Sequence, residues 1–259
     1  MKFIKGIIIS VLCCFIITGC KTKSFTIATW NIGHFANGTS PNSLIKGEDY
    51  GKKLELYRML FEDMDADILC LNEYSESFGS DSKGVERKTR EVLLNNYEKI
   101  AEGNQVGLSC NAFFSHFNIT KVERHEFKST TEFVKELPRA ANYYYLSCDL
   151  RYKRKTVKIV CAHTISSNSS LCQKMIAEII EAYNNYDRVV LCGDWNTGNY
   201  RKFIEAGYSL GNDGAFKTYP QKSFPLDNIM VKGLKINEVR MIRTDLSDHC
   251  PLICNISLK

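Results

Sequence analysis

The sequence predicts an α/β fold in which the β-sheets are mixed and largely antiparallel. Short apolar runs of β type alternate along the chain with segments whose apolar residues recur at helical spacing. Two of the runs, 142–152 and 156–163, are separated only by a short basic turn, which predicts a hairpin. Other runs are separated by helical segments, the pattern of strand–helix–strand crossovers. Because one chain carries both kinds of connection, we expect helices and mixed sheets to form separate layers.

In the N-terminal half, an apolar run over 24–32 predicts the first strand. A helix is expected over 50–64, where the apolar residues at helical spacing are Leu54, Tyr57, Leu60, Phe61 and Met64. The run 67–72 predicts a second strand, and residues 85–94 form a second helix-like stretch. A further strand is expected over 108–117.

The C-terminal half begins with the two strands of the predicted hairpin. Residues 171–183 predict an amphipathic helix whose apolar face carries Met175, Ile176, Ile179 and Ile180. The run 188–193 predicts a buried strand, and residues 200–206 a short helix. Three further strands are expected over 226–231, 234–242 and 251–258.

Composition and organisation indicate one globular domain, expected over residues 25–259. The chain has 44% hydrophobic and 24% charged residues, which is ordinary for a globular protein. It contains no internal repeat and no Pro/Gly/Ser-rich boundary. The formal net charge of +5 is a mild excess, which permits phosphate-bearing substrates without indicating nucleic acid. We expect a monomer.

Residues 1–19 predict a secretion signal. Lys2 and Lys5 give a positive start, an apolar run follows, and small residues precede Cys20. The pattern resembles a bacterial lipoprotein signal, in which the chain is cut before Cys20 and the thiol receives lipid. The alternative is an uncleaved anchor, but the run is shorter than the roughly 20 apolar residues of a comfortable span. We therefore expect an exported protein, anchored to a bacterial membrane by lipid on Cys20 through a tether over 20–24.

The cysteines favour buried thiols over a disulfide framework. Eleven are present, and eight of them follow Cys20. Several lie inside apolar runs, such as Cys70, Cys161 and Cys192, where a thiol acts as a small hydrophobe. No CxxC pair or Cys/His cluster has zinc spacing. One or two disulfides remain compatible with an exported protein.

Polar residues with catalytic chemistry fall at or just beyond the ends of these apolar strands. They are Asn31, Glu73, His163, Asp194, Asn196, Asp227, Asp248 and His249. Loops at sheet ends are where a rigid scaffold presents site residues. Hard cations such as Mg²⁺ take oxygen ligands, including one or two carboxylates. Phosphoester cleavage needs a metal, a base for water and a donor to the leaving oxygen, and these residue types supply all three. No phosphate-cradling glycine loop competes.

A series of short motifs resembles the endonuclease/exonuclease/phosphatase superfamily. The motifs are Thr29-Trp-Asn-Ile32, Leu69-Cys-Leu-Asn-Glu73, Asn111-Ala-Phe-Phe-Ser115, Pro138-Arg-Ala-Ala141, Cys161-Ala-His-Thr164, Gly193-Asp-Trp-Asn196, Leu226-Asp-Asn-Ile229 and Ser247-Asp-His-Cys-Pro-Leu252. Each is weak alone, but all occur in the order of that family and span nearly all of the mature chain. The resemblance implies a four-layer α/β sandwich, in which two mixed sheets pack face to face with helices outside.

The resemblance also implies the metal ligands of the site. Glu73 would be the main ligand of Mg²⁺, or of Mn²⁺ or Ca²⁺, supported by Asn31 and, from the other side, Asp248. Arg139 would contact phosphate, or else serve as a structural ion-pair partner. Asn72 is a departure, because the family commonly has Gln there.

The resemblance assigns the remaining residues to the reaction. Asp194 would orient or deprotonate the attacking water, and Asn196 would hold a phosphate oxygen. His249 would contact the scissile phosphate, kept cationic by Asp227. His163 would donate to the leaving oxygen, although the sequence offers no second acidic residue to orient it.

The substrate class stays open between several phosphate esters. Loops set specificity in this family, and an export signal disfavours DNA repair. We favour phosphodiester cleavage by a nuclease-like enzyme. A lipid phosphodiesterase or an inositol phosphate phosphatase with the same site is the alternative. A non-catalytic binding protein on this fold is disfavoured by the retention of Glu73, His163, Asp194 and His249.

Overall fold

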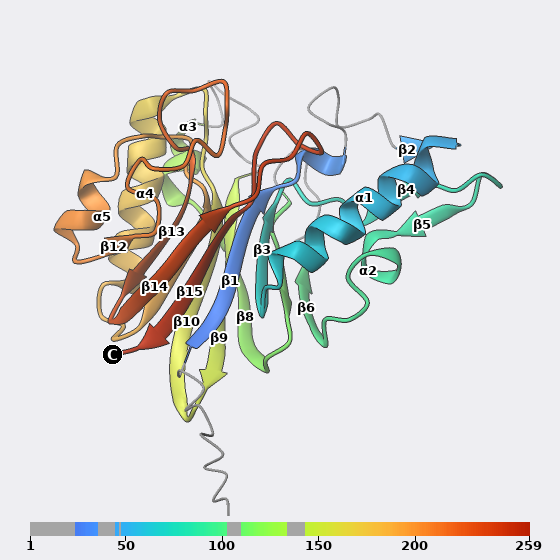
Figure 1. Ribbon diagram of the computed structural model, residues 1–259. Coiled ribbons are helices and arrows are strands. Elements are labelled where there is room, and N and C mark those ends of the chain that lie inside the picture. The colour runs from blue at the N-terminus through green and yellow to red at the C-terminus, as the bar shows by residue number, and fades with distance from the viewer. Residues whose placement is uncertain (1–23, 36–44, 47, 103–109, 134–142) are drawn as a thin grey trace, which may run out of the picture.

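The computed structural model describes residues 24–35, 45–46, 48–102, 110–133 and 143–259 (Figure 1). The expected signal segment, the lipid-bearing Cys20 and the predicted phosphate contact Arg139 lie outside these described residues.

Two six-stranded sheets form the centre of the molecule. The first has the order β14-β15-β1-β3-β7-β6. Its strands are β1 (Ser24–Asn31), β3 (Ile68–Asn72), β6 (Lys99–Glu102), β7 (Ala112–Ser115), β14 (Leu234–Met241) and β15 (Leu252–Leu258). β1 and β3 pair in parallel, and the other pairs of this sheet are antiparallel.

The second sheet has the order β12-β13-β11-β10-β9-β8. Its strands are β8 (Ile119–Glu126), β9 (Tyr144–Tyr152), β10 (Lys155–His163), β11 (Val189–Asp194), β12 (Ser209–Leu210) and β13 (Asp227–Lys232). Only β10 and β11 pair in parallel. The mixed, mainly antiparallel pairing predicted from the sequence is thus confirmed.

Three apolar cores separate four layers of structure. One core lies between the two sheets and contains residues such as Phe25, Cys70 and Ile159. A second covers the outer face of the first sheet, where α1 (Glu48–Met64) packs on β1 and β3 through Tyr57 and Phe61. The third covers the outer face of the second sheet. It lies under the helices α3 (Lys128–Phe133), α4 (Ser169–Tyr183) and α5 (Arg201–Glu205) (Figure 1). The four-layer sandwich is therefore confirmed.

The sequence pattern of α4 explains its place in the outer layer. Met175, Ile176 and Ile179 recur at helical spacing and are fully buried against the second sheet. Asn168 begins the helix as its N-cap, because its side chain accepts a hydrogen bond from the Leu171 amide at 3.0 Å. The expected amphipathic helix over 171–183 is thus confirmed, beginning two residues earlier.

Two element predictions need correction. The helix-like stretch over 85–94 is mostly not helical, because β5 (Glu86–Lys88) occupies its start and α2 (Thr89–Val92) is a single turn. β5 pairs with β4 (Ser77–Ser80), which also pairs with β2 (Ile45–Lys46) in a small separate sheet. The strand expected over 108–117 is shorter among the described residues, where β7 covers only four.

The eight cysteines after Cys20 are free thiols and all are buried. Cys70, Cys161 and Cys192 lie in the core between the sheets, as expected of small hydrophobes. Among the described residues, no helix is long and apolar enough to cross a membrane.

Candidate active site

Strand register brings most of the predicted site residues to one edge of the sheets. β1 and β3 run parallel, and Asn31 pairs with Asn72 at their carboxyl ends. β10 and β11 also run parallel, and His163 pairs with Asp194. β13 begins at this edge, since Asp227 pairs with Asp194 in the antiparallel ladder. The loops that follow β1, β3, β10 and β11 therefore open on one region.

Asn72 joins the two sheets at this edge. Its fully buried side chain accepts a hydrogen bond from the Asp194 amide at 2.9 Å through Oδ1. Its Nδ2 donates to the Ala162 carbonyl at 3.1 Å and to Oδ1 of Asn111 at 2.7 Å. Because Glu73 follows Asn72 directly, these bonds fix the position of the Glu73 backbone relative to β10 and β11. The departure from Gln at this position thus has a clear structural role.

Asn31 lies between the two predicted carboxylates. Its Nδ2 donates to Oε1 of Glu73 and to Oδ2 of Asp194, both at 3.1 Å. The Gly33 amide donates to Asn31 Oδ1 at 3.1 Å, which fixes the orientation of the Asn31 amide. In this orientation the amide nitrogen of Asn31 faces the Glu73 carboxylate and holds it in place, while the amide oxygen of Asn31 faces the Gly33 amide.

The backbone around Glu73 is left-handed, which is uncommon for a residue with a side chain. Glu73 has φ 48°, and the adjoining turn η1 (Gly33–Phe35) has φ 57°, 51° and 62°. The His34 amide donates to the Glu73 carbonyl at 2.8 Å, and its buried ring places Nε2 3.7 Å from Glu73 Oε2. Strain of this kind costs roughly 1–3 kcal/mol per non-glycine residue and clusters at functional sites. Here it turns the Glu73 side chain off the end of β3.

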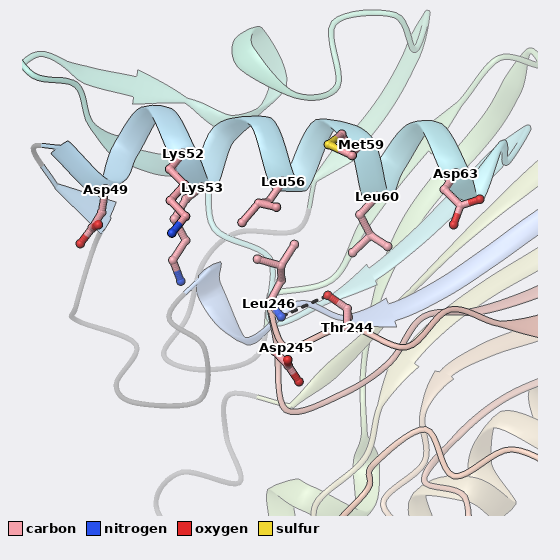
Figure 2. Close-up of a pocket in the computed structure, with 10 residues that line it drawn as sticks. All are labelled: Asp49, Lys52, Lys53, Leu56, Met59, Leu60, Asp63, Thr244, Asp245 and Leu246. Atoms are coloured by element: carbon pink, nitrogen blue, oxygen red, sulfur yellow. Dashed lines mark hydrogen bonds between the residues drawn. The ribbon is translucent and has the colours of Figure 1, made fainter.

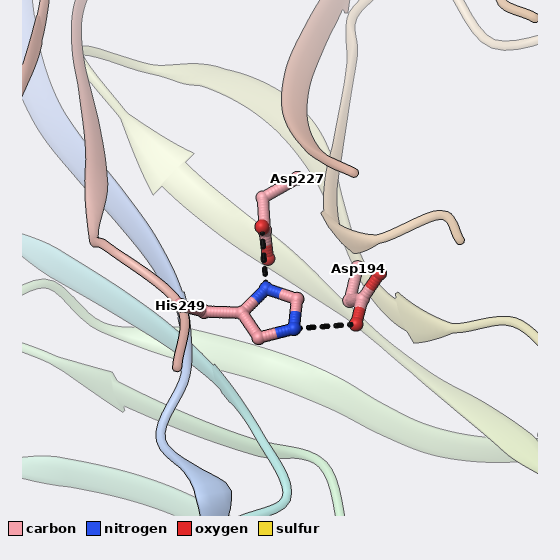
Figure 3. A group of neighbouring side chains, drawn as sticks. All are labelled: Asp194, Asp227 and His249. Carbon is pink, nitrogen blue, oxygen red and sulfur yellow. Dashed lines mark hydrogen bonds and ion pairs between the residues drawn. The ribbon is translucent and has the colours of Figure 1, made fainter. Parts of the chain in front are cut away.

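Asp227, His249 and Asp194 form a buried line of interacting groups (Figure 3). His249 Nδ1 lies 2.7 Å from Asp227 Oδ2, and its Nε2 lies 3.6 Å from Asp194 Oδ2. Burial opposes a charge on His249, but the two carboxylates outweigh it and raise the pKa to about 10. Burial also raises the pKa of Asp194, although the His249 ring counteracts that shift. The imidazole is therefore held as a cation between two acids.

The loop that carries His249 is tied to the end of β1. The Ser247 hydroxyl donates to the Asn31 carbonyl at 2.8 Å and accepts from the His249 amide at 3.2 Å. The Trp30 indole donates to the His249 carbonyl at 2.9 Å. His249 thereby enters the site from the first sheet, while its partners Asp194 and Asp227 belong to the second.

His163 faces the same two carboxylates. Its Nε2 lies 3.6 Å from Asp194 Oδ2 and 3.9 Å from Glu73 Oε1. Its Nδ1 is buried and has no hydrogen-bond partner among the described residues. This agrees with the sequence, which offers no acid to orient the ring through that nitrogen.

Asn196 is held beside Asp194 rather than at the start of a helix. Its amide donates to Asp194 Oδ1 at 3.0 Å, and its φ of 46° is a conformation that Asn tolerates. Its Nδ2 donates to the Thr164 carbonyl at 2.8 Å, which leaves the second N–H of that group for another acceptor. α5 begins only at Arg201, so Asn196 is not its cap.

Asp248 is less closely connected to the site than the other predicted residues. It is partly exposed, and its Oδ1 lies 3.3 Å from the Ser247 hydroxyl. Among the described residues it forms no hydrogen bond or ion pair with Glu73. The electrostatic effect of its carboxylate nevertheless reaches both His249 and Tyr219.

Two candidates for holding a metal ion lie at this edge, a group of three side chains and the single carboxylate of Glu73. Asp194, Asp227 and His249 place ligand atoms within 4.8 Å of one another. However, Asp227 and His249 are bonded to each other, and a cationic imidazole repels a metal. Glu73 is the better candidate, because its carboxylate is a quarter exposed and is held by a hydrogen bond from the neutral amide of Asn31. An oxygen donor beside a second carboxylate and open to water fits Mg²⁺.

A cavity of about 700 Å³ lies apart from this edge, between α1 and residues 244–246 (Figure 2). Leu56, Met59 and Leu60 of α1 form its apolar wall, and Lys52 and Lys53 lie at one end. None of the described residues that line it belongs to the predicted site. The predicted site residues therefore lie outside this cavity, at the strand ends.

Sequence reasoning missed three residues around the site. The sequence marks Asn72 as a departure from the family pattern but does not indicate its role between the sheets, which depends on contacts distant in the chain. His34 follows the Thr29–Ile32 motif closely, but the left-handed turn that places it beside Glu73 has no sequence signal beyond Gly33. Tyr219, whose ring packs on His249, lies in a loop without a recognised motif.

Comparison with known proteins agrees with this arrangement. Residues 28–249 match the model of the endonuclease/exonuclease/phosphatase family. Curated protein sequences yield no significant match.

Solved structures share the fold at low sequence identity. An endonuclease/exonuclease/phosphatase protein from Beutenbergia cavernae has a TM-score of 0.68 at 15% identity, covering 91% of this chain and 72% of that one. TDP2 from D. rerio, complexed with single-strand DNA product, has a TM-score of 0.63 at 13% identity, covering 90% and 98%. ANGEL2, a 2′,3′-cyclic phosphatase in complex with adenosine-2′,3′-vanadate, has a TM-score of 0.61 at 16% identity, covering 90% and 95%.

The family match spans most of the chain and includes the strand-end residues described above. This chain therefore belongs to the endonuclease/exonuclease/phosphatase family.

Proposed function

We propose that this chain is a metal-dependent phosphodiesterase that hydrolyses its substrate with an activated water molecule. Family membership supports phosphate ester hydrolysis as the class of reaction. One observation carries the rest: two imidazoles converge on Asp194 Oδ2, with Nε2 of His163 and of His249 each 3.6 Å away. The Glu73 carboxylate lies near the same nitrogen of His163, with Oε1 3.9 Å from Nε2.

Glu73 is the residue we assign to the metal, with Mg²⁺ as the expected ion and Mn²⁺ or Ca²⁺ as substitutes. When bound, such an ion offsets the negative charge that develops on the phosphate. Asn31 holds the Glu73 carboxylate through its 3.1 Å hydrogen bond. Asp248 would complete the ligand set through water, since it forms no direct contact with Glu73 among the described residues.

Asp194 is the group we assign to the attacking water. Burial raises its pKa, which makes the carboxylate a stronger base than an exposed aspartate. The Asn196 amide and Asn31 Nδ2 each donate to one of its oxygens and fix the plane of the carboxylate. The remaining N–H of Asn196 is available for a phosphate oxygen.

His249 supplies a positive charge for the phosphate. Asp227 holds its Nδ1 at 2.7 Å, so Nε2 carries a proton that it donates toward the reaction centre. His163 presents Nε2 to the same space and is the group we assign to the leaving oxygen. The two histidines thus approach Asp194 from the first and second sheets, which suits a phosphate held between them.

The choice of a diester rests on the fold relatives as well as on the site. TDP2 from D. rerio was solved with a single-strand DNA product, and ANGEL2 is a 2′,3′-cyclic phosphatase. Both descriptions concern ligands that contain nucleosides. Their likeness to this chain concerns the fold, so the substrate has to be tested directly.

The test measures p-nitrophenolate release by the full-length chain in mild detergent. The substrates are bis(p-nitrophenyl) phosphate and p-nitrophenyl phosphate, each with Mg²⁺, Mn²⁺ or EDTA. We expect metal-dependent turnover of the diester above that of the monoester. His249→Ala and Asp194→Asn should each lower kcat by about 100-fold or more, the usual effect of losing such groups.

Matched control variants lie at the opposite edge of the sheets. His116 is exposed beside the start of β3, and Asp187 is exposed just before β11. His116→Ala and Asp187→Asn should leave kcat within about twofold. Turnover that persists in EDTA, or that survives in His249→Ala, would refute the proposed mechanism.

We also propose that the protein is exported and carries lipid on Cys20. The supporting observation is the sequence pattern before Cys20, which lies four positions before the start of β1. Cys20→Ser should move the protein from the membrane fraction to the soluble fraction of the producing cells. Equal membrane association of both forms would contradict lipid anchoring.

A further inference from the structure

The ring of Tyr219 packs against the ring of His249 at the edge of the site. The two ring centroids are 4.8 Å apart with an interplanar angle of 49°. Unlike His249, which is buried, Tyr219 is partly exposed. The electrostatic effects of Asp248 and Asp194 reach its hydroxyl and add to the burial that raises its pKa. Tyr219 thus presents an aromatic surface next to the imidazole assigned to the scissile phosphate.

The residue before Tyr219 is anchored to the backbone of Asp227 and of Cys250, the residue after His249. The Asp227 amide donates to Thr218 Oγ1 at 3.1 Å, and the Cys250 amide donates to the Thr218 carbonyl at 2.7 Å. Thr218 is fully buried. Tyr219 is therefore positioned by the same backbone that positions Asp227 and His249, although it has no part in their hydrogen bonds.

The start of this loop is also held rigidly. Asn212 accepts from the Gly214 and Phe216 amides through Oδ1 and donates to the Phe216 carbonyl at 2.8 Å. Asn228, the residue after Asp227, exchanges hydrogen bonds with the Asn212 backbone at 2.7 and 2.9 Å. A loop fixed in this way loses little conformational entropy when a ligand binds to it.

A second exposed ring, that of Phe224, lies against the loop that follows Asp194. Phe224 is 40% exposed and rests on Gly198, where an added Cβ would stand 2.7 Å from the ring. Gly198 follows Asn196 by two residues. The 217–224 loop therefore carries one aromatic ring against His249 and another against the chain that follows Asp194.

The charges that line a groove beside the Tyr219 loop favour an anionic ligand. A groove of about 370 Å³ between the loop and the end of β14 is lined by Lys217, Arg243 and the apolar residues Pro220 and Met241. Asp245 is the one carboxylate among the described residues that line it. Exposed rings beside cations are the arrangement that binds single nucleic-acid strands, in which bases stack and phosphates pair.

We infer that Tyr219 is a specificity-determining residue, whose ring stacks on a nucleoside of the substrate next to the scissile phosphate. The inference rests on the proposed phosphodiesterase function and names its substrate class as a nucleotide-bearing diester. A choline head group would also be attracted to an aromatic face. However, Lys217 and Arg243 repel a cationic head group and attract the next phosphate of a strand.

The test uses three diesters with the same leaving group, so that the chemistry of the departing oxygen is constant. They are the p-nitrophenyl esters of methyl phosphate, of thymidine 5′-phosphate and of phosphorylcholine. The full-length chain should have its highest kcat/KM with the thymidine ester. In Tyr219→Leu the ratio of kcat/KM for the thymidine ester to that for the methyl ester should fall about tenfold, the effect of one stacked base.

Two further variants distinguish the effect of the Tyr219 ring from that of its hydroxyl and from that of losing any exposed tyrosine. Tyr219→Phe keeps the ring and loses the hydrogen bond to Gln221, so it should keep the thymidine preference. Tyr186 is 45% exposed at the opposite edge of the sheets from the site. Tyr186→Leu should change kcat/KM for neither the thymidine ester nor the methyl ester. Because the ratio compares two substrates on one variant, partial unfolding affects both values equally.

The outcomes distinguish this inference from the proposed function. No metal-dependent turnover of any ester would overturn both. Turnover of the methyl ester without a preference for thymidine, or a preference that survives in Tyr219→Leu, would overturn the role of Tyr219 alone. A preference for the phosphorylcholine ester would assign the site to a lipid head group instead.

Discussion

Replacing Asn72 by Ala should destabilise the fold and disturb the site together. The substitution removes three buried hydrogen bonds, to the Asp194 amide, the Ala162 carbonyl and the Asn111 side chain. Each buried group left without its partner costs about 1–3 kcal/mol. Some of the loss will be recovered by relaxation or by a water molecule, so we expect a decrease of about 3–5 kcal/mol in the free energy of unfolding. Against a typical stability of about 5–15 kcal/mol, this is a large fraction.

Urea denaturation followed by circular dichroism measures this effect. With a slope near 3 kcal/mol/M, the midpoint should fall by about 1–1.7 M. Asn185 is exposed beyond the end of α4, so Asn185→Ala should stay within about 0.5 kcal/mol of the unchanged protein. A decrease below about 1 kcal/mol for Asn72→Ala, with an unchanged slope, would show that these bonds do not hold the sheets together.

Two further changes test the electrostatics and the backbone of the site. In metal-free Asp227→Asn, the pKa of His249 should fall from about 10 toward or below its ordinary 6.5. Because its pKa is raised, protonated His249 stabilises the fold fully below pH 6.5, and this stabilisation is lost as the pH rises through about 10. In the variant, the free energy of unfolding should therefore depend less on pH over this range. NMR titration of the ring protons would contradict this if the pKa stayed near 10. Gly193→Ala places a Cβ 1.8 Å from the Ala162 carbonyl at φ 141°, so thermal unfolding should show a loss of several degrees. An unchanged melting temperature would refute the strain.

The sequence predicts the site well where chemistry and strand periodicity coincide. Asp194 and His163 end apolar runs whose side chains are fully buried, and parallel pairing then places them side by side. Asp227 begins a strand of the same kind in the opposite direction. Because such runs have only one way to lie in a buried sheet, the polar residues at their ends are brought to a shared edge.

The elements that the sequence did not predict are those with little apolar pattern. β8 is an edge strand in which only Ile119 is buried, so polar residues occupy a strand without alternation. β5 is exposed throughout and is defined by its pairing with β4. In both strands the conformation is set by a neighbour rather than by burial, and a single sequence does not reveal that neighbour.

Long-range contacts explain why the residues around the site were harder to predict than the catalytic candidates. Tyr219 reaches His249 because Thr218 accepts hydrogen bonds from the backbone amides of Asp227 and of Cys250, the residue after His249. His34 reaches Glu73 because two left-handed segments meet at the ends of β1 and β3. Neither contact follows from residue type or spacing, since both depend on how loops pack after the sheets have formed.

The site exists only where the two sheets meet, which couples its geometry to the core between them. Glu73 and Asn31 end strands of the first sheet, whereas His163 and Asp194 end strands of the second. The 3.1 Å bond from Asn31 to Glu73 therefore lies within the first sheet, and the 3.1 Å bond from Asn31 to Asp194 crosses from the first sheet to the second. A ligand that binds carboxylates of both sheets must stabilise their packing, because it binds the folded state alone. By the same reasoning, a change in the inter-sheet core shifts Asp194 relative to Glu73 without touching either residue, and the reaction is sensitive to such shifts.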